Sequence, residues 1–228
     1  MNISQKRLAL FILFSVVLTV ISCDKKLDKD GGYYDKESKT YKLVRPKQTS
    51  VSESSLKVFS PVPEKSQNIQ GITTRIDDDA KSIWVKIEDR RPYMVLANSL
   101  SSGNRNDKDK ELRIILKYVS PTGSVTMGSE FREKWRRHTI NILKQQLVDK
   151  TVLAEIDYQE KARSFQGTIH TIIQTEDGDR ARNINLWMVL QGLSFYFIDQ
   201  GKSPLDSQFV NAQKMAMEKR DGLWKYKR

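Results

Sequence analysis

The chain is poor in cysteine and histidine, and it lacks an apolar run long enough to cross a membrane. Cys23 is the single cysteine among 228 residues, and His138 and His170 are the only histidines. One cysteine excludes an intramolecular disulfide and any zinc site built on several thiolates, and two histidines cannot form a metal cluster by themselves. The longest apolar run, residues 8–21, has 14 residues, short of the ~20 that a membrane-spanning helix needs.

The charge of the chain is mainly of one sign. Lys and Arg number 39 against 28 Asp and Glu, which gives a formal net charge of +11. Residues 1–22 carry +2 of this and residues 23–80 carry +1, which leaves +8 on residues 81–228. An acidic partner such as nucleic acid, anionic lipid or a cell-wall polymer is therefore favoured. The length suits one domain with one good core.

The N-terminus has the pattern of a targeting segment. Lys6 and Arg7 precede the apolar run, and Ser22 and Cys23 follow it, which predicts a signal peptide over residues 1–22. The stretch Val20-Ile21-Ser22-Cys23 resembles the lipobox of bacterial lipoproteins, although leucine is commoner where Val20 stands. This resemblance implies lipidation of Cys23 and an extracytoplasmic protein anchored to a bacterial membrane, on the periplasmic side or at the cell surface.

Residues 23–80 are polar and only sparsely apolar. From residue 24 onward they hold 11 Lys and Arg and 10 Asp and Glu without a sustained hydrophobic period, which predicts a lipidated, mostly disordered tether. A short strand within residues 56–59 stays open. We interpret Asp77-Asp78-Asp79 as a solvated stretch, because it lacks the alternating ligand spacing of a calcium loop.

Residues 81–228 alternate between strand and helix patterns and predict one α+β domain. Strands are expected at residues 82–88, 93–100, 112–118, 151–158 and 165–174, and helices at residues 129–147, 184–190 and 207–220. In the third strand, Leu112, Ile114 and Leu116 fall on one face and Arg113 on the other. His170 is expected at a solvent-facing strand position.

Five strands with a helix between the third and fourth is the order of an OB-type barrel. The domain resembles the staphylococcal nuclease (thermonuclease) family, which implies a five-stranded OB-type β-barrel with three helices. The resemblance is carried by four stretches of this sequence: Arg113-Ile114-Ile115-Leu116, Gly128-Ser129-Glu130, Ile184-Asn185 through Gln191-Gly192-Leu193, and Gly222-Leu223-Trp224.

The resemblance also implies a chemistry, phosphodiester hydrolysis with one calcium ion. In this family two aspartates and a threonine backbone oxygen hold the metal, a glutamate activates water, and two arginines stabilise charge on the phosphate. Calcium requires several hard oxygen ligands, and in-line attack requires a base beside the water and cations beside the phosphoryl oxygens.

Carried onto this chain, the family's site is incomplete. Arg113 matches the first arginine. The second aspartate, the threonine and the glutamate fall on Tyr118, Val119 and Pro121. Pro121 offers no general base, and the loss of a base costs on the order of 10²–10⁴ in rate.

The remaining family positions fall on less certain residues. The first-loop aspartate falls near Arg90, with Glu88 and Asp89 as weak metal candidates, and the second arginine falls on Gln166, with Arg163 nearby. The candidates for phosphate or polyanion binding are therefore Arg90, Arg91, Arg113, Arg163 and Gln166. Arg113 is either a surviving phosphate ligand or a strand arginine paired with a carboxylate.

The sequence thus predicts a lipid-anchored protein with a catalytically degenerate thermonuclease-like domain that binds nucleic acid or another polyanion and needs no cofactor. One alternative is an active calcium-dependent nuclease that uses Glu88 or Asp89, Arg113 and an unrecognised base. The other is a surface adhesin or envelope scaffold that binds a protein partner. Calcium-dependent cleavage would distinguish the active nuclease from the catalytically degenerate domain.

Overall fold

A computed structural model describes residues 32–37, 39–43, 56, 58–61, 69–122, 128–176, 178–199 and 201–226. The strands are β1 Gly32–Asp35, β2 Thr40–Leu43, β3 Phe59–Pro61, β4 Ile69–Ile76, β5 Ser82–Lys86, β6 Arg105–Asn106, β7 Glu111–Leu116, β8 Val119–Ser120, β9 Thr151–Gln159, β10 Ser164–Thr175, β11 Gly178–Asn183 and β12 Phe195–Tyr196. The helices are α2 Arg90–Ala97, α3 Ser129–Leu147, α4 Ile184–Leu190 and α5 Asp206–Lys219, with 3₁₀ turns η3 Ser102–Asn104 and η4 Gly222–Lys225.

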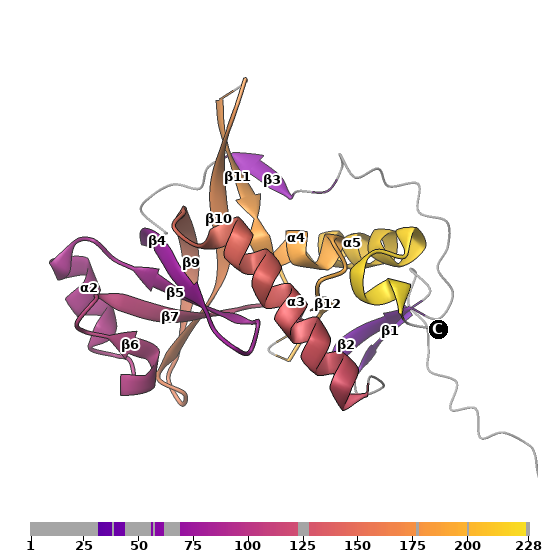
Figure 1. Cartoon of the computed structure of the whole chain (residues 1–228), viewed down its shortest axis with the longest axis horizontal. Coiled ribbons are helices and arrows are strands. Elements are labelled where there is room, and N and C mark those ends of the chain that lie inside the picture. The colour runs from indigo at the N-terminus through magenta and orange to yellow at the C-terminus, as the bar shows by residue number, and fades with distance from the viewer. Residues whose placement is uncertain are drawn as a thin grey trace, which may run out of the picture.

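Five of these strands form a partly closed ring. Antiparallel pairing joins β7 to β5, β5 to β4, β4 to β9 and β9 to β10. Parallel pairing of β10 with β7, from Phe165 opposite Ile114 to Gly167 opposite Leu116, closes the circuit. This α+β arrangement, with α3 between the third and fourth ring strands (Figure 1), is OB-like.

The ring encloses the core because its strands alternate apolar and polar residues. Ile83, Val85, Leu112, Ile114 and Leu116 are fully buried, so the core-facing side expected for Leu112, Ile114 and Leu116 of β7 is confirmed. Where strands cross closely, a side chain would not fit. A Cβ on Gly167 would lie 2.5 Å from the Glu155 carbonyl oxygen, which explains the glycine in β10.

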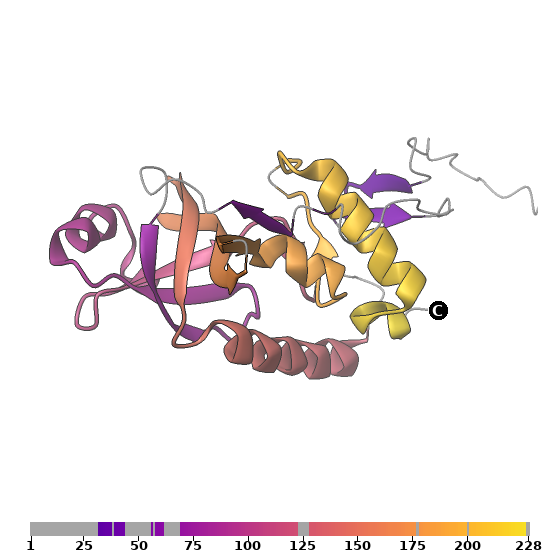
Figure 2. The same cartoon turned by 90° about the horizontal axis from the view of Figure 1, so that it is seen from above.

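The helices cover the outside of the ring. Figure 2 shows α3 along one side of the molecule, with α4 and α5 together at the end that also carries β1 and β2. Buried Asn185 attaches α4 to the ring: its Nδ2 donates to the carbonyls of Lys117 (2.8 Å) and Gly167 (3.0 Å), and its Oδ1 accepts from the Ile169 amide (3.0 Å). The expected helices at residues 129–147, 184–190 and 207–220 are confirmed within one residue at either end.

The strand expected at residues 93–100 is wrong, because residues 90–97 form α2. Tyr93, Ala97 and Leu100 are each about 1% exposed, and their spacing of four and three residues is the helical one. The described helices therefore number four rather than three. The helix α2, η3 and β6 are inserted between ring strands β5 and β7 and project at one end of the molecule (Figure 1).

The expected boundary between tether and domain at residue 80 is also too late. The strand β4 belongs to the ring, although its buried positions are Gly71, Thr73 and Ile76 and give little hydrophobic signal. Further toward the N-terminus, the β1–β2 hairpin packs on the domain. The Gln213 side chain donates to the carbonyl of buried Tyr41 at 2.7 Å. Parts of residues 23–80 are therefore ordered elements of the fold.

The predicted signal peptide, residues 1–22, and the predicted lipidation site, Cys23, are outside the residues that the structure describes. Within the part of the chain that the structure describes, the helices are too short or too polar to cross a membrane.

Candidate functional site around Arg113

Arg113 lies in the middle of β7, opposite Trp84 of β5, with its side chain on the outer face of the ring. Its neighbours Leu112 and Ile114 point into the core and are fully buried, so the alternation of the strand fixes the outward direction of Arg113. The side chain is 24% exposed. The side chain of Arg113 is therefore at the surface, where it could meet a phosphate.

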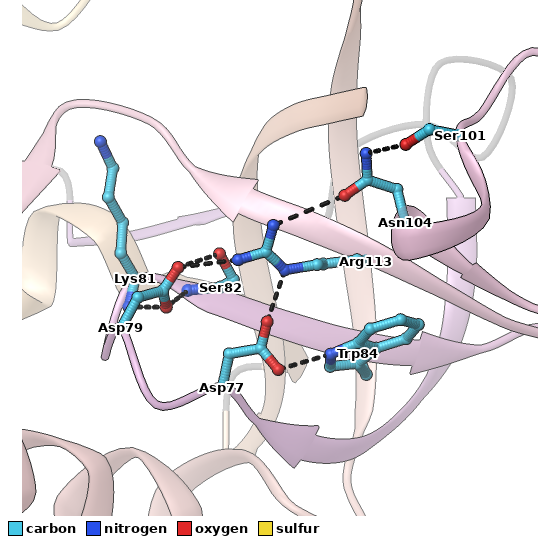
Figure 3. Close-up of polar contacts among 8 residues, drawn as sticks. All are labelled: Asp77, Asp79, Lys81, Ser82, Trp84, Ser101, Asn104 and Arg113. Atoms are coloured by element: carbon cyan, nitrogen blue, oxygen red, sulfur yellow. Dashed lines mark hydrogen bonds and ion pairs between the residues drawn. The ribbon is translucent and has the colours of Figure 1, made fainter. Parts of the chain in front are cut away.

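The turn between β4 and β5 brings two aspartates to this arginine. Arg113 Nε donates to Asp77 Oδ2 at 2.5 Å, and Nη2 donates to Asp79 Oδ2 at 2.9 Å (Figure 3). These are charge-assisted bonds in a half-buried setting. Of the two interpretations from sequence, the structure favours a strand arginine paired with carboxylates.

The same aspartates also shape the turn. Asp79 accepts from the amides of Lys81 and Ser82 at 2.8 and 2.7 Å and from Ser82 Oγ at 2.6 Å. Asp77 Oδ1 accepts from the Trp84 indole at 2.7 Å. Aspartate favours such turns because its short side chain reaches nearby backbone amides. All four carboxylate oxygens therefore already have donors.

Asn104 of η3 lies on the other side of Arg113. Its Oδ1 is 3.5 Å from Arg113 Nη1, and its Nδ2 donates to Ser101 Oγ (2.8 Å) and to the Arg163 carbonyl (3.1 Å). The guanidinium of Arg163 donates in turn to the carbonyls of Ser99 and Leu100, both at 3.3 Å. Arg163 thus attaches the β9–β10 turn to the end of α2 instead of pointing to Arg113.

Lys81 does not add a free cation to this cluster. Burial lowers the pKa of Lys81, and its ammonium lies 4.7 Å from the centre of the Phe197 ring. Figure 3 shows the ammonium directed away from Arg113. The cluster therefore pairs one guanidinium with two carboxylates.

The metal candidates expected from sequence lie elsewhere. Glu88 and Asp89 follow β5, whereas the Asp77–Asp79 turn precedes it, so the two pairs lie beyond opposite ends of that strand. Arg90 and Arg91 are exposed on α2. Arg90 therefore lies after the second ring strand, whereas the loop before that strand holds Asp77 and Asp79. The missed signal is an aspartate run directly before an alternating strand.

The other family positions carry no carboxylate. The centre of the Tyr118 ring lies 5.7 Å from the centre of the Phe209 ring. Lys117 Nζ lies 5.0 Å from the centre of the Tyr118 ring. Val119 and Pro121 are buried. Gln166 is half-buried on β10, opposite Asp157 of β9 and Ile115 of β7.

The donor set around Arg113 does not fit a calcium ion. Calcium requires six to eight oxygen ligands, several of them carboxylate. Here the oxygens of Asp77 and Asp79 already accept from an arginine and from fixed donors. Within the described ranges, no three His, Cys, Asp or Glu side chains come together as a metal-binding group.

Apart from the Arg113 cluster, a hollow of about 400 Å³ lies on the outer face of β9 and β10. Its lining includes Lys117, Tyr118, Glu155 and His170. The expected solvent-facing position of His170 is wrong, because the residue is 5% exposed. Its Nε2 lies 3.1 Å from Glu155 Oε1, and this neighbour lowers the pKa of Glu155. One lysine lines this hollow, Lys117, and its ammonium pairs with the Asp157 carboxylate at 2.5 Å.

A comparison with known protein families finds a match to the C-terminal half of the chain. The model of the family described as staphylococcal nuclease homologue matches residues 106–226, from β6 to η4 and including Arg113 and Tyr118. The ring strands β4 and β5 and the Asp77–Asp79 turn precede the matched residues. No curated protein matches the chain. Because the match covers more than half of the 228 residues, the chain belongs to the staphylococcal nuclease homologue family.

Proposed function

We propose that this protein is a lipid-anchored, extracytoplasmic member of the family that binds a polyanion, best nucleic acid, without cleaving it. One observation carries the proposal. The retained arginine is bound by Asp77 and Asp79, and no carboxylate stands at Tyr118 or Pro121 to complete a catalytic site.

The ion pairs that Arg113 makes with Asp77 and Asp79 oppose a catalytic role for this arginine. A guanidinium that already donates to two carboxylates must give up these bonds to bind a phosphate, and the phosphate would then approach two negative charges. Cleavage also needs a base beside the attacking water, and Pro121 has no ionisable group. Both effects oppose hydrolysis and leave the fold intact.

Binding of a polyanion is supported by the charge of the domain. Residues 81–228 carry +8, and such an excess attracts phosphate polymers over several ångströms in a salt-dependent way. OB-like folds use outer strands and loops for this type of binding. The proposal for the membrane anchor depends on Val20-Ile21-Ser22-Cys23, and the short apolar run before it favours anchoring over spanning.

An active nuclease is the second candidate, and one observation favours it. Asp77 and Asp79 place carboxylates beside Arg113, as a first-loop metal ligand requires. In this case calcium would displace the arginine from one aspartate. A protein-binding scaffold is the third candidate, and it predicts no affinity for polyanions beyond nonspecific charge.

One titration separates the three candidates. The chain from residue 24 onward, which contains every described element, is mixed with labelled single-stranded DNA, double-stranded DNA and RNA, with calcium or with a chelator. Fluorescence anisotropy reports binding between 50 and 400 mM salt, and a denaturing gel reports cleavage. We expect intact oligonucleotides under both conditions, and binding that weakens steeply with salt.

The control variant is Arg113→Ala. Because its guanidinium is committed to Asp77 and Asp79, we expect the affinity to change by less than about twofold. Calcium-dependent cleavage that Arg113→Ala abolishes would overturn the proposal in favour of an active nuclease. Absence of both binding and cleavage would favour the scaffold.

A further inference from the structure

The insertion that carries α2 forms a basic hollow at one end of the molecule. The hollow has a volume of about 490 Å³ and lies between α2 and the turn at residues 107–110. Four cationic side chains and one acidic side chain line it: Arg90, Arg105, Lys108, Lys110 and Asp107. A surface with this balance attracts anions.

Two of these cations hold the local structure. Arg105 Nη1 donates to the Ala97 carbonyl at 2.8 Å, and Lys110 Nζ donates to the Glu88 carbonyl. The single acid is also engaged, because Asp107 Oδ1 accepts from buried Tyr93 at 2.6 Å and Oδ2 lies 3.5 Å from Arg105 Nε. The hollow is therefore built by fixed contacts, and its one carboxylate is already paired with an arginine.

The other cations are uncommitted. Within the described part of the chain, the side chains of Arg90, Lys108 and the adjacent Arg91 make no hydrogen bond or ion pair, and all three residues are exposed. This differs from Arg113 and Arg163, whose guanidinium groups already have acceptors. An incoming anion need not displace an existing acceptor from Arg90 or Lys108, as it would at Arg113.

The position of α2 and the types of its exposed side chains indicate which class of anion the hollow would bind. Figure 1 shows α2 at the end of the molecule opposite β1 and β2. Since an anchor at Cys23 precedes β1, the hollow would face away from the protein's own membrane. The exposed apolar residues of α2 are Met94 and Val95, and neither is an aromatic platform for stacking bases. The chemistry present recognises a charged backbone rather than bases.

We propose that this hollow binds the phosphodiester backbone of a polymer, with Arg90 and Lys108 as the main contacts and Arg91 beside them. The inference rests on the proposed polyanion binding and assigns it to a surface outside the family's catalytic site. Binding is independent of base sequence, because its contacts are to phosphates.

The test compares two double variants of the chain from residue 24 onward. The variant Arg90→Glu/Lys108→Glu reverses two uncommitted cations of the hollow. The matched control, Arg132→Glu/Lys144→Glu, reverses two exposed cations of α3 whose side chains make no hydrogen bond or ion pair in the described residues. Circular dichroism and thermal unfolding establish that both variants fold. The probes are a 20-nucleotide oligo(dT), an abasic strand of the same length and inorganic polyphosphate.

We expect the α2 variant to bind oligo(dT) at least about tenfold more weakly and to lower the slope of log affinity against log salt by about two. The control should change affinity by less than about threefold. Equal affinity for oligo(dT) and the abasic strand supports backbone recognition, and a preference for polyphosphate over both identifies phosphate density as the feature recognised.

Two results would overturn the inference. Equal weakening by the α2 variant and the control would mean that the charge acts diffusely, and unchanged binding by the α2 variant would place the site elsewhere. In both cases the wild-type chain still binds, so the proposed function stands. If the wild-type chain binds none of the probes, the proposed function fails with the inference.

Discussion

At the scale of single residues, the positions that carry the resemblance to the family fall into two groups. Asn185, Gly192 and Gly222 support the fold through backbone contacts. Tyr118 and Pro121, where the resemblance implies catalytic carboxylates, carry none. Such a fold does not depend on catalytic groups, because different residues carry the fold and the chemistry.

Glycine is required at positions 192 and 222 because two turns meet closely. Gly192 and Gly222 both have positive φ (63° and 55°), and the Leu223 amide donates to the Gly192 carbonyl at 2.9 Å. A Cβ on Gly222 would lie 2.4 Å from that carbonyl oxygen. No side chain fits here without moving the backbone of the other turn.

We expect Gly222→Ala to destabilise the fold by about 3 kcal/mol, from the left-handed backbone and the backbone clash together. For a domain of this size the melting temperature should fall by roughly 6–12 °C. Calorimetry checks this against Gly103→Ala, whose added Cβ meets open space. Equal melting temperatures for the two variants would contradict the close contact between the turns.

At the scale of elements, the β1–β2 hairpin is held by a polar cluster at the start of α5. The hydroxyl groups of Tyr34 and Tyr196 both donate to Asp206 Oδ1, at 2.7 Å for Tyr196. The Ile198 amide donates to the Lys39 carbonyl at 2.9 Å. Burial, followed by contact with Asp206, raises the pKa of both tyrosines above the ordinary value of 10.0.

This shift predicts a loss of stability in alkali. A group whose pKa is raised by folding contributes stability below its unfolded pKa and loses it as the pH rises above that value. Melting temperatures measured from pH 8 to 11 should therefore fall above about pH 10, and less steeply for Tyr34→Phe than for the wild-type chain. The same slope for both chains would show that Tyr34 does not couple the hairpin to pH.

Strong periodic patterns made four of the five ring strands and three of the four described α-helices predictable from sequence. The strands β5, β7, β9 and β10 and the helices α3 to α5 carry clear apolar alternation or helical spacing. The strand β4 gives little hydrophobic signal, because its core positions hold Gly71 and Thr73, and the sequence of α2 predicts a strand although it forms a helix. Without a predicted β4, nothing in the sequence indicates that the Asp77–Asp79 turn joins two ring strands. Its contact with Arg113 is therefore not predictable from sequence.

At the scale of the whole molecule, the proposed anchor and the proposed binding surface belong to opposite ends of the fold. Only eight residues, 24–31, lie between Cys23 and β1, a reach of at most about 28 Å. The described strands β1, β2, β3 and β4 lie within residues 23–80, where the sequence predicts a mostly disordered tether. The basic hollow at α2 lies at the opposite end (Figure 1).

The central claim is that the fold persists while the metal site does not. The most direct measurement is a calcium titration of the chain from residue 24 onward, followed by thermal unfolding and by calorimetry. A site occupied at 100 times its dissociation constant would stabilise the fold by about 2.7 kcal/mol. We predict no change in melting temperature and no saturable heat up to 10 mM calcium. Saturable binding that Asp79→Asn abolishes would contradict the account and show that the Asp77–Asp79 turn still holds a metal.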